Sequence, residues 1–540
     1  MNNIFSLKSD PSEGSIPTEV YGYRPYLLAF SATWASAMYG YDSAFNIGGT
    51  LNLPSFKRAF NLADKSNIEL ASLSSNIVST FQAGAFFGCI IGFASAERLG
   101  RKPVLLGSAV VFTIGVILQT LGQLGPFYGG RAITGLAIGA SSTIIPIYIA
   151  ECSPALIRGR LVGIFEIMLQ SALVVGFWVN YGVAINIPNE SDAQWRIPVS
   201  VQFIPAGLLL LTMPFFYIES PRWLLTKGHT QKGRQVLSYI RHLPEDHEYI
   251  EKEIFEIQTS LNYELETSSG SRLYQIKEIL APGVRWHVVM SVLLMLLQNL
   301  TGSNALNYYS PTIFRSIGFT GTSVALLATG VYGIIKMVTT LIFMVFIVDR
   351  FGRRPALLIG AHGAILATFY LGAYTKLSGS FYQTPPQDAG SKTAIAVIYI
   401  YAIFYGFSWN GIPWIFASEV LPNRVRTLGN MCAVCTQWLG QFIVVYSLPY
   451  MIETIANGTF LFYGASTVVA FIFAFLFIPE TKGVPLEDMD LIFGVDAPLL
   501  AIPAQRRYKE MKDAGVNAAI IHRAMDAKTD REVSHIEDAI

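Results

Sequence analysis

The sequence contains few charged residues. Only 14% of its 540 residues are Asp, Glu, Lys or Arg, against roughly a quarter in an ordinary soluble domain. The mean hydropathy is +0.43, and the charges lie in clusters separated by apolar stretches of about 20 residues, long enough to cross a hydrocarbon core as helices. These features exclude a soluble globular protein and predict a membrane protein. The net charge of +1 gives no reason to expect a nucleic-acid partner.

Cysteine is scarce as well. The four cysteines do not form the framework of a disulfide-rich or zinc-binding domain. Cys432 and Cys435 form a C-x-x-C pair inside an apolar run, without a strand-to-helix turn or a second ligand pair, so the pair favours neither a redox nor a metal site. The polar N-terminus has no apolar stretch behind a basic start, which predicts a cytoplasmic tail and not a cleaved signal peptide.

The motifs of enzyme chemistry are missing too. No spacing places a nucleophile beside a base, and no cluster has the spacing of metal ligands. The glycine-rich run from Gly130 to Gly139 follows no strand, so it indicates helix packing and not a nucleotide loop. We therefore expect no enzyme activity, no cofactor, no metal and no ATP-driven transport.

The sequence does contain twelve apolar segments long enough to span a bilayer. They are too long for strands and lack period-two alternation, so they predict an all-α polytopic membrane protein. The predicted spans are residues 25–44, 70–93, 103–122, 126–149, 160–184, 199–218, 286–309, 323–348, 355–375, 394–417, 429–450 and 460–478.

Basic residues predict the orientation of these spans. Lys and Arg gather in the loops after spans 2, 4, 8 and 10, whereas the loops after spans 3 and 11 have none. Because cytoplasmic loops carry the excess of positive charge, the even-numbered loops and both termini are predicted to be cytoplasmic. The loop after span 1 is discordant, since it carries Lys57, Arg58 and Lys65.

Five regions follow from this layout. We predict a cytoplasmic tail (1–24), an N-terminal six-helix half (25–218), a cytoplasmic linker with amphipathic helices (219–285), a C-terminal six-helix half (286–478) and a cytoplasmic tail (479–540) with a surface helix. Asn189 and Asn457 lie in N-glycosylation sequons of predicted outer loops, whereas Asn299 has the same pattern inside a span, where a glycan is implausible.

The two halves repeat one another in their charges. The run Glu97–Lys102 after span 2 matches Asp349–Arg354 after span 8, and the ends of spans 4 and 10 share their acid–proline–arginine spacing. Such duplication is common in secondary transporters. These charges are either topological only or, as we favour, a cytoplasmic gate that links the halves. The predicted gate residues are Glu97, Arg98, Arg101, Glu151, Arg158, Glu219, Arg222, Asp349, Arg350, Arg353, Glu419, Arg426 and Glu480.

Ordered motifs run through both halves: G-R-K and G-R-R, Pro146-x-Tyr148-x-x-Glu151, the endings E-S-P-R and P-E-T-K-G, and Gln298…Gly302-x-Asn304…Tyr308-Tyr309. Together these motifs resemble the sugar porter family of the major facilitator superfamily. The resemblance covers roughly residues 25–490, and it implies twelve helices in two six-helix halves around a central site. Within the family, residues 298–311, Lys336 and the stretch from Arg160 to Glu166 resemble fungal quinate permeases.

Asp42 and Arg131 are ionisable residues inside predicted spans, where a charge costs several kcal/mol. Asp42 lies about 17 residues into the outward-running span 1 and Arg131 about 5 residues into the inward-running span 4, so both reach similar depth and can pair. They are either a permanent salt bridge or a proton-coupling pair. The resemblance favours the second, because the acid of the matching Gly40-Tyr41-Asp42 motif carries the proton in proton-coupled relatives.

Lys336 lies near the middle of span 8. It is either tied to a carboxylate, for which Glu166 in span 5 is the available partner, or it faces an anionic substrate. By resemblance, Glu166 replaces a Gln that binds a hydroxyl in sugar-carrying relatives.

A substrate site is predicted around span 7. Amides there can both donate to and accept from hydroxyls, and the resemblance adds three residues from spans 10 and 11. Together with Glu166 and Lys336, the predicted substrate-binding residues are Gln298, Asn299, Asn304, Asn307, Tyr308, Trp414, Gln437 and Trp438.

The sequence thus predicts a proton symporter of quinate or a related polyhydroxylated carboxylate, working by alternating access. The plasma membrane is the expected location and a vacuolar membrane the alternative. A hexose, pentose or polyol transporter, proton-coupled or facilitative, remains an alternative. A nutrient sensor on the same fold, which transports nothing, is a second. The expected partners are a small molecule, the proton and the lipid bilayer, and one subunit is expected to suffice.

Overall fold

A computed structural model describes residues 17–62, 65, 67–154, 157–216, 218–267, 277–316, 322–380, 388–422, 425–482, 484, 489–494 and 497–513. In this part of the chain the regular structure is helical throughout, as predicted. The N-terminal half contains α1 (Tyr23–Ala32), α2 (Trp34–Gly48), α3 (Pro54–Ala59), α4 (Asn67–Leu99), α5 (Arg101–Thr120), α6 (Leu124–Cys152), α7 (Arg158–Asn186), α8 (Ala193–Val201) and α9 (Phe203–Phe216).

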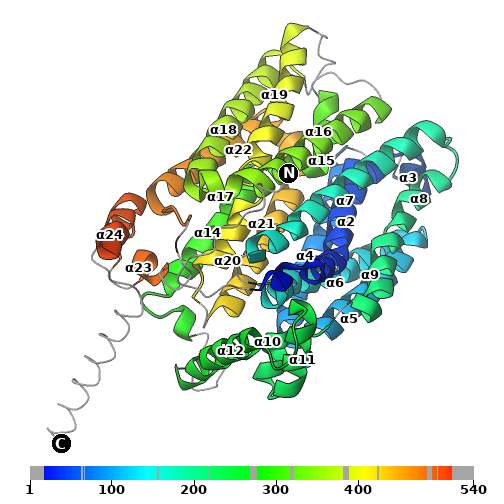
Figure 1. Ribbon diagram of the computed structural model, residues 1–540. Helices are drawn as coiled ribbons and strands as arrows, with labels where there is room; N and C mark the ends of the chain where they lie inside the picture. The colour runs from blue at the N-terminus through cyan, green and yellow to red at the C-terminus, as the bar shows by residue number, and fades with distance from the viewer. Residues whose placement is uncertain are drawn as a thin grey trace, which may run out of the picture.

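The C-terminal half begins after a group of linker helices, α10 (Pro221–Thr226), α11 (Thr230–Arg241) and α12 (Glu248–Thr267). Figure 1 shows the two halves side by side, with the linker helices at one end of the bundle. We call this the linker end and the opposite one the far end. The C-terminal half contains α14 (Arg285–Leu300), α15 (Ser303–Ser316), α16 (Thr322–Ile342), a π-helical turn η4 (Phe343–Ile347), α17 (Val348–Phe351), α18 (Arg353–Leu377), α19 (Ala389–Gly406), α20 (Ile412–Val420), α21 (Arg426–Ile455) and α22 (Gly458–Phe477).

Ten described helical segments are long and apolar enough to cross a membrane. The predicted spans 1 and 7, which occupy the same place in the two halves, are each divided into two helices. Thr33 separates α1 from α2 while keeping a nearly helical backbone. Between α14 and α15, Gly302 has a φ of +91°, which side chains with a Cβ rarely adopt. Divided helices at matching positions are typical of transporter binding sites.

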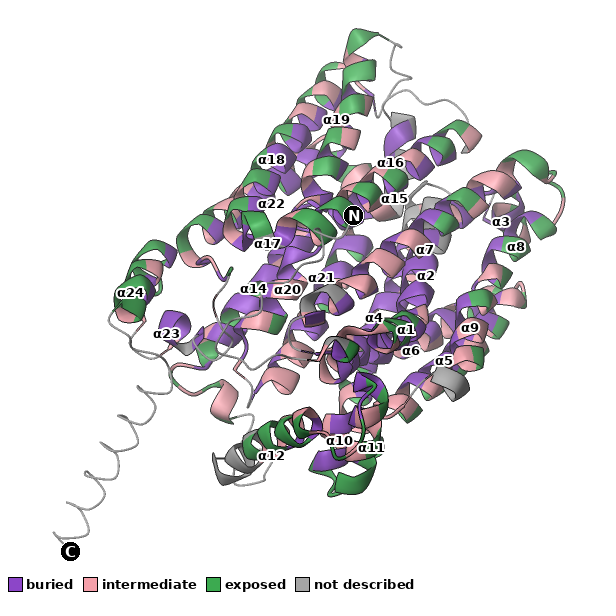
Figure 2. Ribbon diagram, in the orientation of Figure 1, coloured by how far each residue is buried: buried purple, intermediate pink, exposed green. Residues whose placement is uncertain are grey.

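Close packing of α4 against α6 forms the centre of the N-terminal half. Gly84, Gly88 and Gly92 on α4 face the backbone of α6, and a Cβ added to Gly88 would lie 2.2 Å from the carbonyl oxygen of Leu136. Small residues allow this approach in lipid, where packing holds helices together without water exclusion. Burial follows the same logic: buried residues line the inside of the bundle, and exposed ones its outer surface (Figure 2).

The halves meet chiefly where α2 packs on α15, α4 on α21 and α7 on α16. Toward the far end, Ser75 Oγ donates to the carbonyl oxygen of Tyr446 at 2.7 Å. Val78 and Val445 are both fully buried and pack together. The far end is therefore where α4 and α21 close the space between the halves.

The linker helices are held against the N-terminal half. Arg241 is buried on α11, pairs with Glu253 at 2.6 Å and donates to the carbonyl oxygen of Cys152 at the end of α6 at 2.8 Å. Trp223 Nε1 donates to the carbonyl oxygen of Glu97 at 3.2 Å. The predicted amphipathic linker helices are thus present and anchored to one half.

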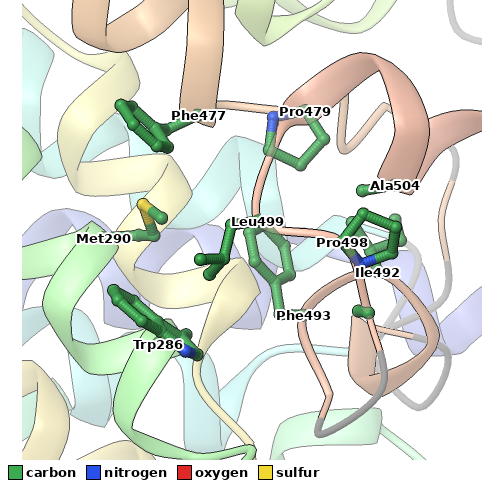
Figure 3. A pocket seen from close by; sticks show the side chains of 10 residues that line it. Trp286, Met290, Phe477, Pro479, Ile492, Phe493, Pro498, Leu499 and Ala504 are labelled. Atoms are coloured by element: carbon green, nitrogen blue, oxygen red, sulfur yellow. The ribbon is translucent and has the colours of Figure 1, made fainter.

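Two short helices after α22 pack on the C-terminal half instead. They are α23 (Met489–Phe493) and α24 (Ala501–Asp513), and α24 confirms the surface helix predicted in the C-terminal tail. A pocket between them and α14 is lined by apolar side chains such as Trp286, Phe477 and Leu499 (Figure 3). It lies at the linker end, away from the polar groups described next.

Candidate functional site

Asp42 on α2 and Arg131 on α6 form an ion pair inside the N-terminal half. Arg131 Nη1 lies 2.8 Å from both carboxylate oxygens, and both side chains are fully buried. The guanidinium also donates to the carbonyl oxygen of Ile77 at 3.3 Å and lies over the ring of Phe81. The two residues predicted to pair do so, while their role in proton coupling stays a prediction.

The predicted amides of span 7 lie at the division between α14 and α15. Asn299 Nδ2 donates to Gln437 Oε1 at 2.7 Å, and Asn304 Nδ2 donates in turn to Asn299 Oδ1. Asn299 is fully buried, in line with the expectation that its sequon carries no glycan. The side chain of Tyr308 lies outside the described residues.

Gln298 points in another direction. Its Nε2 donates to the backbone carbonyl oxygens of Trp409 and Asn410 at 2.7 and 3.1 Å, while its Oε1 is buried without a hydrogen-bond partner in the described part of the chain. Ser303 Oγ and the Tyr332 hydroxyl are buried without one too. Ser303 lies near the hydroxyls of Tyr332 and Tyr405, and Gln298 lies near Tyr405. Buried polar groups are normally satisfied, so these groups form one polar cluster whose hydrogen-bonding capacity is only partly used.

Lys336 on α16 is almost fully buried, with 2% of its surface exposed. Its Nζ lies 3.4 Å from Asn307 Oδ1 and 5.2 Å from the centroid of the Tyr405 ring. Within the described residues it forms no ion pair at 4.0 Å or less. Glu166, its expected partner, is therefore near it in the fold but not in direct contact with its ammonium group.

Glu166 on α7 joins the two halves through neutral amides. Its Oε1 accepts from Gln170 Nε2 at 2.7 Å, one turn further along α7, and from Asn410 Nδ2 of the C-terminal half at 2.8 Å. Asn410 Nδ2 also donates to Thr340 Oγ1 on α16 at 3.1 Å. The carboxylate is thus a central acceptor at the interface between α7, α16 and the segment between α19 and α20.

Gln170, Asn410 and Thr340 were not predicted from the sequence. Gln170 could have been found because it follows Glu166 by one helical turn. Asn410 lies in the stretch Ser408–Pro413, where a polar residue beside Gly411 and Pro413 interrupts an otherwise apolar span. Thr340 carries no such signal, since a Thr in a span usually bonds its own helix.

The predicted aromatic residues border this polar region. The ring of Trp414 on α20 lies 6.2 Å from that of Phe165 on α7. Trp438 on α21 is buried, with its ring 4.9 Å from Tyr39 and its Nε1 donating to Ser142 Oγ at 3.3 Å. Both tryptophans come from the C-terminal half and contact the N-terminal half, so they lie at the interface between the halves.

The predicted gate residues of the N-terminal half form one cluster at the linker end. Arg101 pairs with Glu151 at 2.7 Å, and its backbone N–H donates to Glu219 at 2.9 Å. The carboxylate of Glu219 therefore caps the start of α5, where backbone N–H groups lack helical partners. Burial raises the pKa of Glu219, although backbone N–H donors stabilise its charge.

The C-terminal half repeats this cluster residue for residue. Arg353 pairs with Glu419 at 2.6 Å, and its backbone N–H donates to Glu480 at 2.9 Å. Gly100 and Gly352, which precede the two arginines, have φ values of +100° and +97°. The predicted repeat is thus a repeat of local structure. The Arg101–Glu151 pair lies within the N-terminal half and the Arg353–Glu419 pair within the C-terminal half, so in this structure neither pair joins the halves.

The remaining gate residues have other surroundings. Glu97 contributes its carbonyl oxygen to Trp223, and Arg426 Nε donates to the carbonyl oxygen of Leu421. The side chain of Asp349 lies outside the described residues. Arg98 and Arg350 are exposed, and Arg158 and Arg222 are half-buried.

The loop between α7 and α8 at the far end contacts Arg58, one of the discordant basic residues after span 1. Arg58 pairs with Asp192 at 3.3 Å and donates to the carbonyl oxygens of Asn189 and Glu190. Its charge is therefore compensated locally. The sequon residue Asn189 is exposed, and Asn457 is half-buried at the start of α22.

Comparison with known proteins identifies the family. Residues 28–493 match the family model described as sugar (and other) transporter. A quinate permease of Neurospora terricola is 42% identical over 504 residues, which cover 91% of this chain and 92% of the relative. A probable quinate permease of Aspergillus flavus is 42% identical with 91% of each chain covered.

Solved structures agree. The proton:xylose symporter XylE bound to 6-bromo-6-deoxy-D-glucose has a TM-score of 0.73 and 28% identity, and the match covers 87% of this chain and 99% of that one. A partially occluded inward open conformation of XylE from E. coli has a TM-score of 0.71 and 27% identity, with 86% and 99% covered. The relatives are permeases and transporters, not enzymes. The chain belongs to the sugar porter family of the major facilitator superfamily and is a multi-pass membrane transporter with twelve membrane spans, some of them divided, in two halves.

Proposed function

We propose that the protein is a proton symporter of quinate or a closely related polyhydroxylated carboxylate. The observation that carries the proposal is Lys336, a buried cation that no carboxylate of the described residues contacts within 4.0 Å. A buried charge is costly unless it is closely paired, and the carboxylate of a bound substrate would supply the direct contact that Glu166 does not make. The quinate permeases that share 42% of their residues with this chain support the same substrate.

Amide and hydroxyl groups around Lys336 match the rest of such a substrate. Gln298 Oε1, Ser303 Oγ and the Tyr332 hydroxyl are buried and without hydrogen bonds in the described part of the chain. Hydroxyl groups on a ring can donate to Gln298 Oε1, and they can donate to or accept from the hydroxyls of Ser303 and Tyr332. Trp414 and Trp438 would border the apolar face of the ring, as aromatic side chains commonly do in small-molecule sites.

Proton coupling is assigned to Asp42 and Arg131. Protonation of Asp42 would break an ion pair between α2 and α6 that is fully buried. Burial disfavours the charged carboxylate of Asp42, while Arg131 favours it. A change in the hydration of the pair is therefore enough to shift Asp42 between its protonated and ionised forms. The structural neighbour XylE is a proton:xylose symporter, which supports a coupled mechanism on this fold.

Alternating access would move one half against the other around this site. The linker end is assigned to the cytoplasm on the strength of the basic loops. The five regions predicted from sequence, both cytoplasmic termini and a plasma-membrane location are part of the proposal. The clusters around Arg101 and Arg353 would then form the cytoplasmic gate, which would bridge the halves while the inside is closed and separate when it opens.

Uptake in a transport-deficient yeast tests the proposal. Labelled quinate and labelled glucose are supplied at acidic and at neutral pH, with and without a protonophore. We expect concentrative quinate uptake that is stronger in acid and abolished by the protonophore. Glucose uptake without quinate uptake would contradict the proposal. Neither substrate moving, with the protein at the cell surface, would favour the sensor.

A neutral sugar is the second candidate substrate. The amide cluster of Asn299, Asn304 and Gln437 has no charge, so it suits hydroxyls without requiring a carboxylate, and the neighbour XylE is a symporter of xylose. A sugar carrier would leave Lys336 without an anionic ligand. Competition between quinate and xylose in the uptake assay separates the two candidates.

A further inference from the structure

Glu166 is a buried carboxylate that lacks a direct cationic partner. Only 7% of its surface is exposed, and its hydrogen-bond donors in the described part of the chain are the neutral amides of Gln170 and Asn410. In the described residues no ion pair of 4.0 Å or less reaches it. A carboxylate in such a place is costly to keep ionised unless a nearby charge compensates it.

Lys336 is that charge. Two titratable groups interact electrostatically with Glu166. They are the ammonium group of Lys336 on α16 and the neutral phenol of Tyr405 on α19. From α2, Asp42 is already neutralised by Arg131 of α6. The polar site between the halves therefore contains one carboxylate and one ammonium group that balance each other without touching.

An anionic substrate changes this balance. If its carboxylate pairs with Lys336, the site contains two negative charges and one positive charge, all withdrawn from water. Like charges in a buried site disfavour ionisation of one of them. A proton on Glu166 would restore neutrality, since the substrate then replaces Glu166 as the counter-ion of Lys336.

The amides around Glu166 can serve both protonation states. Gln170 Oε1 is buried without a hydrogen-bond partner in the described part of the chain, while its Nε2 donates to Glu166. Rotating the terminal amide by a half-turn exchanges its donor and acceptor. In that orientation Gln170 Oε1 would accept the hydrogen bond from a protonated Glu166.

We propose that Glu166 is a second proton-binding site, which takes up a proton when a carboxylate substrate pairs with Lys336. This inference rests on the proposed function. Together with the proton on Asp42, two protons then accompany each monoanionic substrate, and each cycle carries one net positive charge. A single proton per quinate would make transport electroneutral.

Proton uptake on binding tests the assignment directly. Purified full-length protein in weakly buffered detergent solution receives quinate while a pH dye reports protons taken up per quinate bound. In Asp42→Asn we expect an uptake of about one proton per quinate bound. In the double variant Asp42→Asn/Glu166→Gln we expect no proton uptake. Quinate binding to Asp42→Asn without any proton uptake would overturn the proposal.

Transport provides the second measurement, which does not require the Glu166 variant to be active. In proteoliposomes containing the unmodified protein, an inside-negative potassium diffusion potential should accelerate uptake of labelled quinate at equal pH on both sides. A rate of quinate uptake that does not depend on the membrane potential would contradict a second proton on Glu166, but it would be consistent with symport of one proton. Absence of any quinate binding or uptake would instead refute the proposed function itself.

Discussion

At the scale of single residues, the site shows how charges are tolerated inside the bundle. Asp42 and Arg131 contact each other directly, whereas Glu166 and Lys336 are stabilised by amides and by an aromatic ring. The first arrangement satisfies both charges within the protein. The second leaves the ammonium group able to accept an anionic partner, which is the physical basis of the specificity that we propose.

Lys336→Gln removes the proposed carboxylate contact. Hydrogen bonds to charged groups contribute about 1.5–3 kcal/mol, so the KM for quinate should rise by about tenfold to a hundredfold. Concentration-dependent uptake of labelled quinate measures the change. Lys392→Gln, at an exposed position on α19, is the matched control and should leave the KM unchanged. An unaltered KM in Lys336→Gln would place the carboxylate elsewhere.

Asp42→Asn removes the carboxylate assigned to proton coupling. At equal pH on both sides of the membrane, we expect uphill quinate uptake driven by an inside-negative potential to be lost. Only the proton on Glu166 would then accompany each monoanionic substrate, so the cycle carries no net charge, while exchange of labelled for unlabelled quinate continues. Accumulation and exchange are measured in the same vesicles. Asp192→Asn, which alters an exposed ion pair with Arg58, should keep both. Continued accumulation in Asp42→Asn under the membrane potential alone would contradict the assignment.

At the scale of helices, close packing and interruption have separate roles. Continuous helices such as α4 and α6 pack through glycines and form the stable frame of the N-terminal half. The divided spans supply the site: Gln298 and Asn299 end α14, Asn304 begins α15, and Asn410 lies between α19 and α20. Where a helix stops, side chains and backbone carbonyls can meet across the interface, as the hydrogen bonds of Gln298 show.

Gly88→Ala tests the packing of α4 on α6. The added Cβ would lie 2.2 Å from the carbonyl oxygen of Leu136, so the helices must separate, at a cost of about 1–3 kcal/mol. We expect a lower melting temperature of the detergent-solubilised protein. Gly107→Ala on α5 has no atom within 4 Å of its new Cβ and gains the same helix propensity. Equal melting temperatures of the two variants would argue against the tight contact.

At the scale of the whole molecule, the halves are held together at the far end while the charge clusters of the linker end remain within each half. Ser75 bonds to Tyr446, and α2 contacts α15. In contrast, the Arg101–Glu151 and Arg353–Glu419 pairs each belong to one half. Alternating access then requires the far-end contacts to break and reform during each cycle.

A cross-link at the far end should stop this movement. Val78 and Val445 are buried together across the interface, so Val78→Cys/Val445→Cys should form a disulfide under a mild oxidant such as diamide. The native thiols of Cys89 and Cys435 also lie side by side on α4 and α21, so both are first replaced by Ser. We expect oxidation to block uptake and a reductant to restore it.

The single variant Val78→Cys in the same background is the control for this cross-link, and oxidation should not affect it. Cross-linking of the oxidised double variant is measured on a gel, where the two halves of a protease-cleaved sample stay joined. If the cross-linked protein still transports at the full rate, the far-end contact does not need to open. Such a result would contradict alternating access through this interface.

The sequence by itself determined the membrane class, the spans, the repeat and the family, because hydropathy and charge are read along the chain and need no knowledge of packing. The positions of Asp42 and Arg131 within their spans were also enough to predict that they pair, because the number of residues along a straight helix gives the depth of a residue in the membrane. Only the tertiary structure decided which side chains of neighbouring helices contact one another. It placed Gln170 and Asn410 on Glu166, kept Lys336 out of direct contact with that carboxylate, and confined the Arg101 and Arg353 pairs to their own halves. These outcomes depend on the rotation of each helix about its axis and on the register between the halves, which no local pattern of residues encodes.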